Sequence, residues 1–250
     1  MNKKEIINKL KEYDLDKNEF VILSSSAMIL KDIKNETSDI DIAVTSKYND
    51  ILLNNYNCKL EKEIKDNGKL YKSYMIDDII NFSTHYYNEY EYEEIDGYKI
   101  QKPEEVLKLK TKLNRDKDQK DIELIKKYLK VKSMNSLSLA YLGDAVYEFY
   151  IRSYLVQSNL KVKDLQAKSV NYVSAKAQSK FLDEMMNDGF LSDEEIEIIK
   201  RARNHKSHSS KSTDIITYKK STGLEALIGY LKLINNDQRI KEIMKYIVGD

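Results

Sequence analysis

One stretch of this sequence constrains the fold more than any other. Residues 137–155 read LSLAYLGDAVYEFYIRSYL. Their apolar side chains recur at the three- and four-residue spacing that is typical of an amphipathic helix, as Leu139, Leu142, Val146 and Phe149 show. Gly143 and Asp144 lie in the middle of this pattern, although both residue types are poor in a helix interior. A glycine leaves room for another element to approach closely, and Asp144 would then face that element. Taken alone, however, an Asp-Gly neighbourhood is more typical of a turn or a helix cap.

Length and composition limit the class of protein. With 250 residues, one or two domains are expected, each large enough to bury a core. Cys58 is the only cysteine, which excludes a disulfide framework and a cysteine-based zinc site. No signal peptide and no apolar run of about 18 residues is present, so we expect a cytoplasmic protein without a membrane segment. Lys and Arg number 42 against 41 Asp and Glu, so the net charge of +1 indicates no partner by itself.

The hydrophobic periodicity changes in the middle of the chain. After residue 137 every segment has helical period, and these segments are 137–156, 164–170, 172–188, 193–203, 222–235 and 237–248. Before it, short apolar runs and the alternating DIDIAV of residues 39–44 predict strands. We therefore predict an α/β domain over residues 1–130 and an all-α domain over residues 131–250, joined by a polar linker at 130–135.

Five blocks in the C-terminal half occur in one order. They are NSLSLAYLGDAV (135–146), VSAKAQ (173–178), KRARNHKS (200–207), TDIITY (213–218) and STGLEALIGYL (221–231). Together they resemble the Mini-ribonuclease III family, the short branch of the ribonuclease III endonucleases. The resemblance implies Mg²⁺-dependent cleavage of double-stranded RNA by a homodimer. It also implies a role in trimming ribosomal RNA precursors.

Asp144 and Glu225 are the candidate catalytic and metal-binding carboxylates. Mg²⁺ prefers oxygen ligands and keeps several waters, so one or two carboxylates suffice to hold it. By resemblance, these two residues match the metal-binding carboxylates of the family. Longer ribonuclease III proteins have two further carboxylates at the positions of Ala140 and Thr222. The Mini branch has the same reduced set as this chain. Whether each site holds one metal ion or two therefore stays open. An alternative for Glu225 is a capping box with Thr222 at the start of a helix.

The segment from residue 200 to 220 is strongly basic. It carries seven Lys or Arg and a single acidic residue, Asp214. By resemblance this is the RNA-facing loop, with the candidate RNA-binding residues Arg201, Arg203, Asn204, Lys206 and Lys211. Basic and hydroxyl side chains suit the phosphates and 2′-hydroxyls of A-form RNA. A solvated loop without a ligand is the alternative.

The N-terminal half contains Ser24–Ser26 followed by Asp39 and Asp41 on one face of a predicted strand. This arrangement resembles the nucleotidyltransferase superfamily of polymerase-β type. The resemblance implies a nucleoside triphosphate bound with Mg²⁺, and the candidate nucleotide-binding residues are Ser25, Asp39, Asp41, Asp78 and Lys117. Ser24 stands where that superfamily has a glycine. An edge strand with exposed Asp residues is the alternative.

Three functions follow from these patterns. The first is Mg²⁺-dependent cleavage of double-stranded RNA, with an appended nucleotidyltransferase-like domain. The second is a nucleotidyltransferase whose all-α domain binds RNA or a partner, and Ser24 argues against it. The third is an RNA-binding scaffold without catalysis, and the presence of both Asp144 and Glu225 argues against it.

Overall fold

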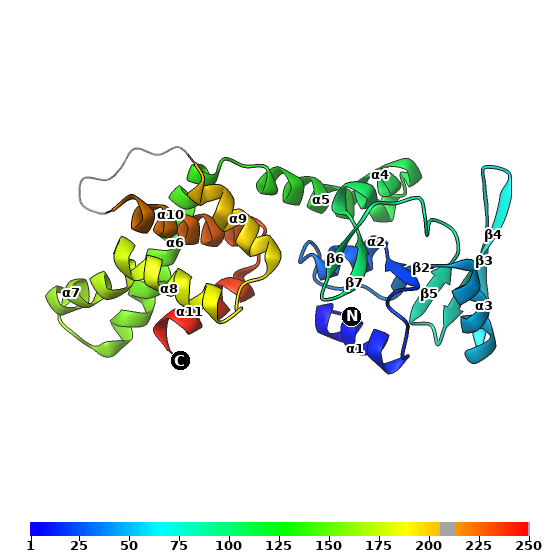
Figure 1. Cartoon of the computed structure of the whole chain (residues 1–250), viewed down its shortest axis with the longest axis horizontal. Helices are drawn as coiled ribbons and strands as arrows, with labels where there is room; N and C mark the ends of the chain where they lie inside the picture. Colours follow the sequence, from blue (N-terminus) through cyan, green and yellow to red (C-terminus); the bar gives the residue numbers. More distant parts are fainter. Residues whose placement is uncertain (206–213, 250) are drawn as a thin grey trace. The chain divides into compact units, whose positions relative to one another are not determined.

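The computed structural model describes residues 1–205 and 214–249. The chain divides into two compact units, Met1–Leu129 and Lys130–Asp250 (Figure 1). The first unit is an α/β structure built on a mixed sheet, and the second is helical, as the periodicity predicts. None of the helices in the described ranges is long and apolar enough to span a membrane.

The first unit contains a seven-stranded sheet of order β3-β4-β5-β2-β1-β7-β6. Strand β1 runs parallel to β7, β2 runs parallel to β5, and the other neighbours are antiparallel. The strands are β1 (Phe20–Ile22), β2 (Ile40–Val44), β3 (Cys58–Asp66), β4 (Lys69–Ile76), β5 (Ile80–Ser83), β6 (Tyr92–Ile95) and β7 (Tyr98–Gln101). The central strands β1, β2 and β5 supply much of the core, because their apolar side chains are almost fully buried.

Five α-helices accompany this sheet. They are α1 (Lys3–Glu12), α2 (Ser24–Leu30), α3 (Ser46–Asn55), α4 (Pro103–Leu113) and α5 (Gln119–Lys132), with a 3₁₀ turn η1 (Asp116–Asp118) before α5. Proline at the first position starts α4, where its missing N–H costs nothing. Helix α5 continues to Lys132, so the polar linker predicted at residues 130–135 is shorter than expected.

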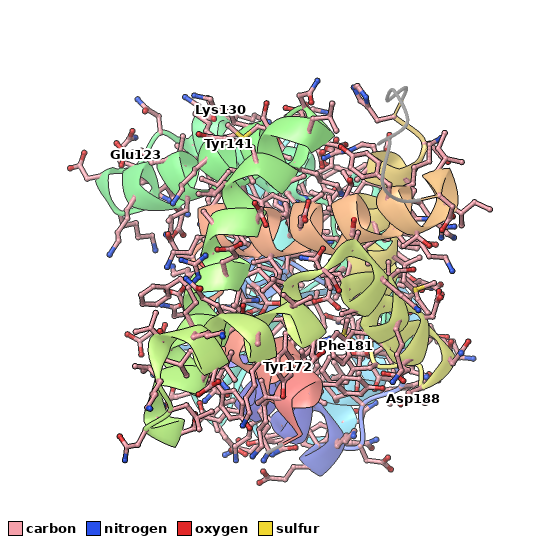
Figure 2. All side chains as sticks on the ribbon, turned by 90° about the vertical axis from the view of Figure 1, so that its left-hand side faces the viewer. Glu123, Lys130, Tyr141, Tyr172, Phe181 and Asp188 are labelled. Carbon is pink, nitrogen blue, oxygen red and sulfur yellow. The ribbon has the colours of Figure 1, made fainter. Side chains whose placement is uncertain are left out.

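The second unit consists of helices α6 (Ser136–Leu155), α7 (Val162–Val173), α8 (Ala175–Asn187), α9 (Asp193–Arg203), α10 (Ile215–Leu233) and α11 (Asp237–Val248), with a 3₁₀ turn η2 (Val156–Ser158) after α6. Helix α10 is the central element, since α6, α8, α9 and α11 all pack against it (Figures 1 and 2). The predicted capping box of Ser192 and Glu195 is present at the start of α9.

The predicted buried face of α6 is wrong in part. The side chains that α6 buries include Leu139, Ala140, Gly143, Tyr147 and Ile151. Phe149, expected on the apolar face, is instead 66% exposed. The reason is the contact of Gly143 with α10, which fixes the rotation of α6 about its own axis and turns Phe149 outward.

Helix α10 begins seven residues earlier than its periodicity predicts. Asp214 caps it by accepting hydrogen bonds from the backbone N–H groups of Ile216 and Thr217. Thr222 and Glu225 therefore lie within the helix, and the Thr222 hydroxyl donates to the Tyr218 carbonyl. The capping-box alternative for Glu225 is consequently wrong, because no helix begins at Thr222.

Candidate functional site

Two glycines allow α6 and α10 to cross with their backbones in contact. A Cβ atom placed on Gly143 would lie 1.7 Å from the carbonyl oxygen of Glu225. A Cβ on Gly229 would lie 2.0 Å from the carbonyl oxygen of Leu139. Real Cβ atoms do not approach backbone this closely, so only glycine fits at either position. The expectation that Gly143 marks a close approach is confirmed.

This crossing brings Asp144 and Glu225 close enough to interact. Asp144 is exposed, whereas Glu225 is partly buried. The pKa of Glu225 is raised to about 7, first by burial and then by the negative charge of Asp144. A side-chain hydrogen bond from Gln178 acts in the opposite direction. The two carboxylates thus repel each other beside solvent, and a divalent cation would relieve that repulsion.

Two further positions, where the resemblance to longer ribonuclease III proteins implies carboxylates, carry none here. Ala140 and Thr222 are buried, at 5% and 6% exposure. The Thr222 hydroxyl is occupied by the Tyr218 carbonyl, at 3.0 Å. The donor set that fits a hard cation therefore consists of Asp144 and Glu225, with coordination to be completed by water.

Two buried polar side chains lie near Glu225, and the sequence patterns did not identify either of them. Tyr147 is fully buried, donates to the Tyr172 carbonyl at 3.0 Å, and has its pKa raised first by burial and then by Glu225. Gln178 is 1% exposed, its Nε2 has no hydrogen-bond partner among the described residues, and its amide opposes the rise in the pKa of Glu225. A signal existed for Gln178, because it occupies a position on the buried stripe of α8 that also contains Leu182 and Met185.

The candidate RNA-binding residues fall into three groups. Arg201 lies in α9 and donates from Nε to the Ser136 hydroxyl at 3.2 Å and from Nη1 to the Lys132 carbonyl, both within the second unit, whereas its buried Nη2 has no hydrogen-bond partner among the described residues. Arg203 ends α9 and Asn204 follows it, with Asn204 exposed. Lys206 and Lys211 lie outside the described residues.

In the first unit, Asp39 and Asp41 lie together as their spacing predicts. The pKa of Asp41 is raised to about 6, first by burial and then by the charge of Asp39. The register of β2 and β5 places Asn81 beside Asp41. Asp78 lies three residues earlier, in the turn between β4 and β5 with φ of +54°. Lys117 is exposed in the η1 turn.

A buried cation near these carboxylates escaped the sequence patterns. Lys110 is 3% exposed and forms ion pairs with Asp118 at 3.0 Å and Asp121 at 2.9 Å. Its positive charge also opposes the rise in the pKa of Asp41. Asp121 accepts a hydrogen bond from Ser25, at 3.2 Å, so the hydroxyl predicted to meet phosphate already has a partner. The signal was present in the spacing, because Lys110 follows the buried Val106 by one helical turn.

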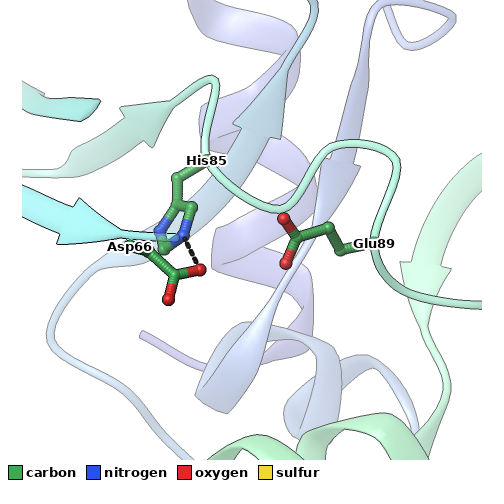
Figure 3. A group of neighbouring side chains, drawn as sticks. All are labelled: Asp66, His85 and Glu89. Atoms are coloured by element: carbon green, nitrogen blue, oxygen red, sulfur yellow. Dashed lines mark hydrogen bonds and ion pairs between the residues drawn. The ribbon is translucent and has the colours of Figure 1, made fainter. Parts of the chain in front are cut away.

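A third cluster lies elsewhere in the first unit. Asp66, His85 and Glu89 each offer one ligand atom, and these atoms lie within 4.8 Å of one another (Figure 3). The Nε2 of His85 is 3.2 Å from a carboxylate oxygen of Asp66. A hydrogen bond between a buried histidine and a carboxylate accounts for this contact without a metal ion.

Known proteins resemble this chain over its C-terminal half. Residues 137–236 match the Ribonuclease III domain. The Mini-ribonuclease 3 of Clostridium tetani is 46% identical over 122 residues, which are 48% of this chain and 80% of that protein. The Mini-ribonuclease 3 of Staphylococcus aureus is 42% identical over 120 residues, which are 47% of this chain and 90% of that protein. A crystal structure of a Fusobacterium nucleatum protein is 34% identical, covers 47% of this chain and 96% of its own, and has a TM-score of 0.44.

The matched domain contains both Asp144 and Glu225 and the glycine crossing between them. The relatives are matched over most of their own length, at identities far above chance. Through its C-terminal half the chain belongs to the Mini-ribonuclease 3 family and is an endoribonuclease of the ribonuclease III class.

Proposed function

We propose that the chain hydrolyses double-stranded RNA at a Mg²⁺ site formed by Asp144 and Glu225. The observation that carries the proposal is the glycine crossing, which sets one exposed and one partly buried carboxylate side by side. A carboxylate whose pKa is raised by burial and by a neighbouring carboxylate, as that of Glu225 is, is a candidate for a functional role. Bound there, Mg²⁺ would neutralise charge on the scissile phosphate and lower the pKa of the attacking water.

The residues of the chain have separate tasks in this proposal. Asp144, exposed on α6, and Glu225, partly buried on α10, would together hold the cation, with Asp144 the more accessible of the two to RNA. Arg203 and Asn204, at the end of α9, would contact the sugar-phosphate backbone, together with Lys206 and Lys211. Because the deep groove of A-form RNA hides the bases, such contacts would recognise duplex shape and not sequence. Arg201 is left out of this set, since it bonds to Ser136 and Lys132.

A homodimer is part of the same proposal. The outer face of α6 and the η2 turn after it carry large apolar side chains that the described residues of the second unit leave wholly or partly exposed. Their exposures are 36% for Leu137, 86% for Tyr141, 66% for Phe149 and 60% for Val156. Figure 2 labels Tyr141 on this side of the unit. A stripe of this kind is typical of an interface with another chain. A second copy would supply the second site needed to cut both strands.

Maturation of ribosomal RNA precursors in the cytoplasm is the role that we propose for this activity, on the strength of the family resemblance. An assay with a structured ribosomal precursor beside an unrelated duplex of equal length would test it. Preferential cleavage at defined positions of the precursor would support the role, and equal random cleavage of both would contradict it.

A second function is proposed for residues 1–130, as a nucleotidyltransferase-like domain. The favouring observation is the paired Asp39 and Asp41 with the buried cation Lys110 nearby. We propose that this pair binds a nucleoside triphosphate through Mg²⁺. Calorimetry on the full chain with each ribonucleotide should give Mg²⁺-dependent heat that Asp41→Asn abolishes. No heat with any of the four would reject the second function and leave the nuclease proposal intact.

The nuclease proposal is tested by substituting each carboxylate. Asp144→Asn and Glu225→Gln should each reduce duplex cleavage by at least about 100-fold, because a single charge-stabilising group carries several kcal/mol. Glu148→Gln is the matched control, since Glu148 lies one turn further along α6 and pairs with Arg152. It should cleave at nearly the wild-type rate. Near-wild-type cleavage by either Asp144→Asn or Glu225→Gln, with an unchanged circular dichroism spectrum, would reject the site.

A further inference from the structure

Gln178 is a polar side chain in an otherwise apolar position. It lies on the inner stripe of α8, where Leu182 and Met185 are buried at 1% and 0% exposure, and it is itself 1% exposed. The Nε2 atom has no hydrogen-bond partner among the described residues, and the amide lies near enough to Glu225 to oppose the rise in the pKa of that carboxyl. The amide is therefore desolvated, its donor is unsatisfied, and it lies beside the Glu225 carboxyl.

Such an arrangement is costly if it serves packing alone. Leaving a buried donor poorly satisfied costs about 1–3 kcal/mol, and an apolar side chain of similar size would avoid that cost. A hydrogen bond to an ionised carboxylate is roughly twice as strong as one between neutral groups. The Glu225 carboxylate is therefore the kind of acceptor that would best offset the burial of the Gln178 amide.

Glu225 also needs an orienting partner more than its counterparts in longer relatives. Glutamate has three rotatable side-chain bonds, and no carboxylate stands beside it at Ala140 or Thr222. The Thr222 hydroxyl is bonded to the Tyr218 carbonyl and is not available to it. Gln178 supplies a buried amide beside Glu225, with a donor that no other described residue uses.

We infer that Gln178 is a positioning residue, whose buried amide holds the Glu225 carboxylate in the orientation that binds the divalent cation. The inference rests on the proposed metal role of Asp144 and Glu225. Gln178 acts through Glu225 and touches neither the cation nor the RNA. Side chains that hydrogen-bond to a metal ligand orient that ligand in many metalloproteins, and their loss typically costs about 10–100-fold in metal affinity or activity.

The test is Mn²⁺ binding to the full chain without RNA, followed by electron paramagnetic resonance. Gln178→Met keeps the length of the side chain and removes the donor. Ser179→Ala is the matched control, since Ser179 is also buried on α8, at 8% exposure, and is its direct neighbour. Asp66, His85 and Glu89 offer another group of ligand atoms that could also bind Mn²⁺. The Mn²⁺ binding assigned to the candidate site is therefore the part that Asp144→Asn abolishes.

Gln178→Met should weaken this Asp144-dependent binding by about 10–100-fold, and Ser179→Ala should leave it unchanged. In Gln178→Met, the Mg²⁺ concentration that gives half-maximal cleavage should rise by the same factor. The affinity for duplex RNA measured without metal should stay constant. Unchanged metal affinity in Gln178→Met would overturn the inference even if Tm fell, since the amide would then serve stability alone. If Asp144→Asn abolishes no binding, the proposed metal site itself is wrong and this inference fails with it.

Discussion

Replacing Gly143 with alanine should separate α6 from α10 and inactivate the enzyme. The added Cβ would lie 1.7 Å from the Glu225 carbonyl oxygen, whereas ordinary contacts begin near 3.4 Å. The two helices would have to move apart locally by about the difference between these distances, 1.7 Å. A backbone carbonyl within a helix cannot rotate away, so the strain cannot be relieved by a rotamer change.

The expected loss of stability follows from these contacts. Overpacking that side chains can absorb costs about 1–3 kcal/mol, so a backbone collision should reach at least about 3 kcal/mol. Alanine gains about 1 kcal/mol over glycine in a helix interior, which leaves a net loss of at least about 2 kcal/mol. Gly229→Ala should behave alike, with its nearest contact at 2.0 Å to the Leu139 carbonyl oxygen. Gly223→Ala is the control, because its Cβ would meet the Ile199 side chain at 3.1 Å, and that side chain can yield.

Native-state hydrogen exchange with peptide resolution is the appropriate assay, since it reports α6 and α10 separately from the first unit. The opening free energy of both helices should fall in Gly143→Ala and Gly229→Ala and stay within about 1 kcal/mol of wild type in Gly223→Ala. Duplex cleavage should be lost in Gly143→Ala even at temperatures where the variant is folded. Equal behaviour of Gly143→Ala and Gly223→Ala would refute the reasoning.

Three further predictions address other parts of the molecule. Phe149→Glu should convert the proposed dimer to a monomer in light scattering without unfolding the second unit, and an unchanged mass would reject the α6 interface. Arg203→Ala should weaken binding to all duplexes alike and reduce the salt slope by about one, and a sequence-dependent loss would contradict a phosphate contact. Burial alone would raise the pKa of Asp118, but hydrogen bonds from Arg115 and Lys110 outweigh it and lower the pKa. The stability that Asp118 contributes is therefore present above its unfolded pKa of about 4 and is lost as the pH falls further. Lys110→Met should cost the first unit about 3–5 kcal/mol at neutral pH, and a urea midpoint within error of wild type would show that the buried ion pair does not stabilise the unit.

Local sequence signals predicted those features whose cause is local. Pro103 starts α4 and Ser192 with Glu195 caps α9, because each acts on its own helix. Gly143 was predicted to mark a close approach for an equally direct reason, since a mid-helix glycine lowers helix stability and needs a compensating contact. Strand β2 was visible in the alternation of residues 39–44.

The rest depended on contacts between distant segments. The rotation of α6 that exposes Phe149 is set by Gly229 of α10, which periodicity within α6 cannot reveal. Lys110 was overlooked because a lysine on an apolar stripe is ordinarily read as exposed, and its acidic partners lie in another element. Gln178 was overlooked for the same reason, since its partner Glu225 is 47 positions away along the chain.

The glycine crossing has an evolutionary consequence. A substitution at Gly143 damages folding and catalysis together, because the atom it would collide with belongs to Glu225. Selection for a folded, protease-resistant chain therefore preserves this part of the active site even in a lineage where RNA cleavage no longer matters. Asp144 has no such protection, since it is exposed and its side chain supports no packing. A lineage that gave up cleavage would accordingly lose Asp144 first, and would keep the helix crossing as a relic of its former activity.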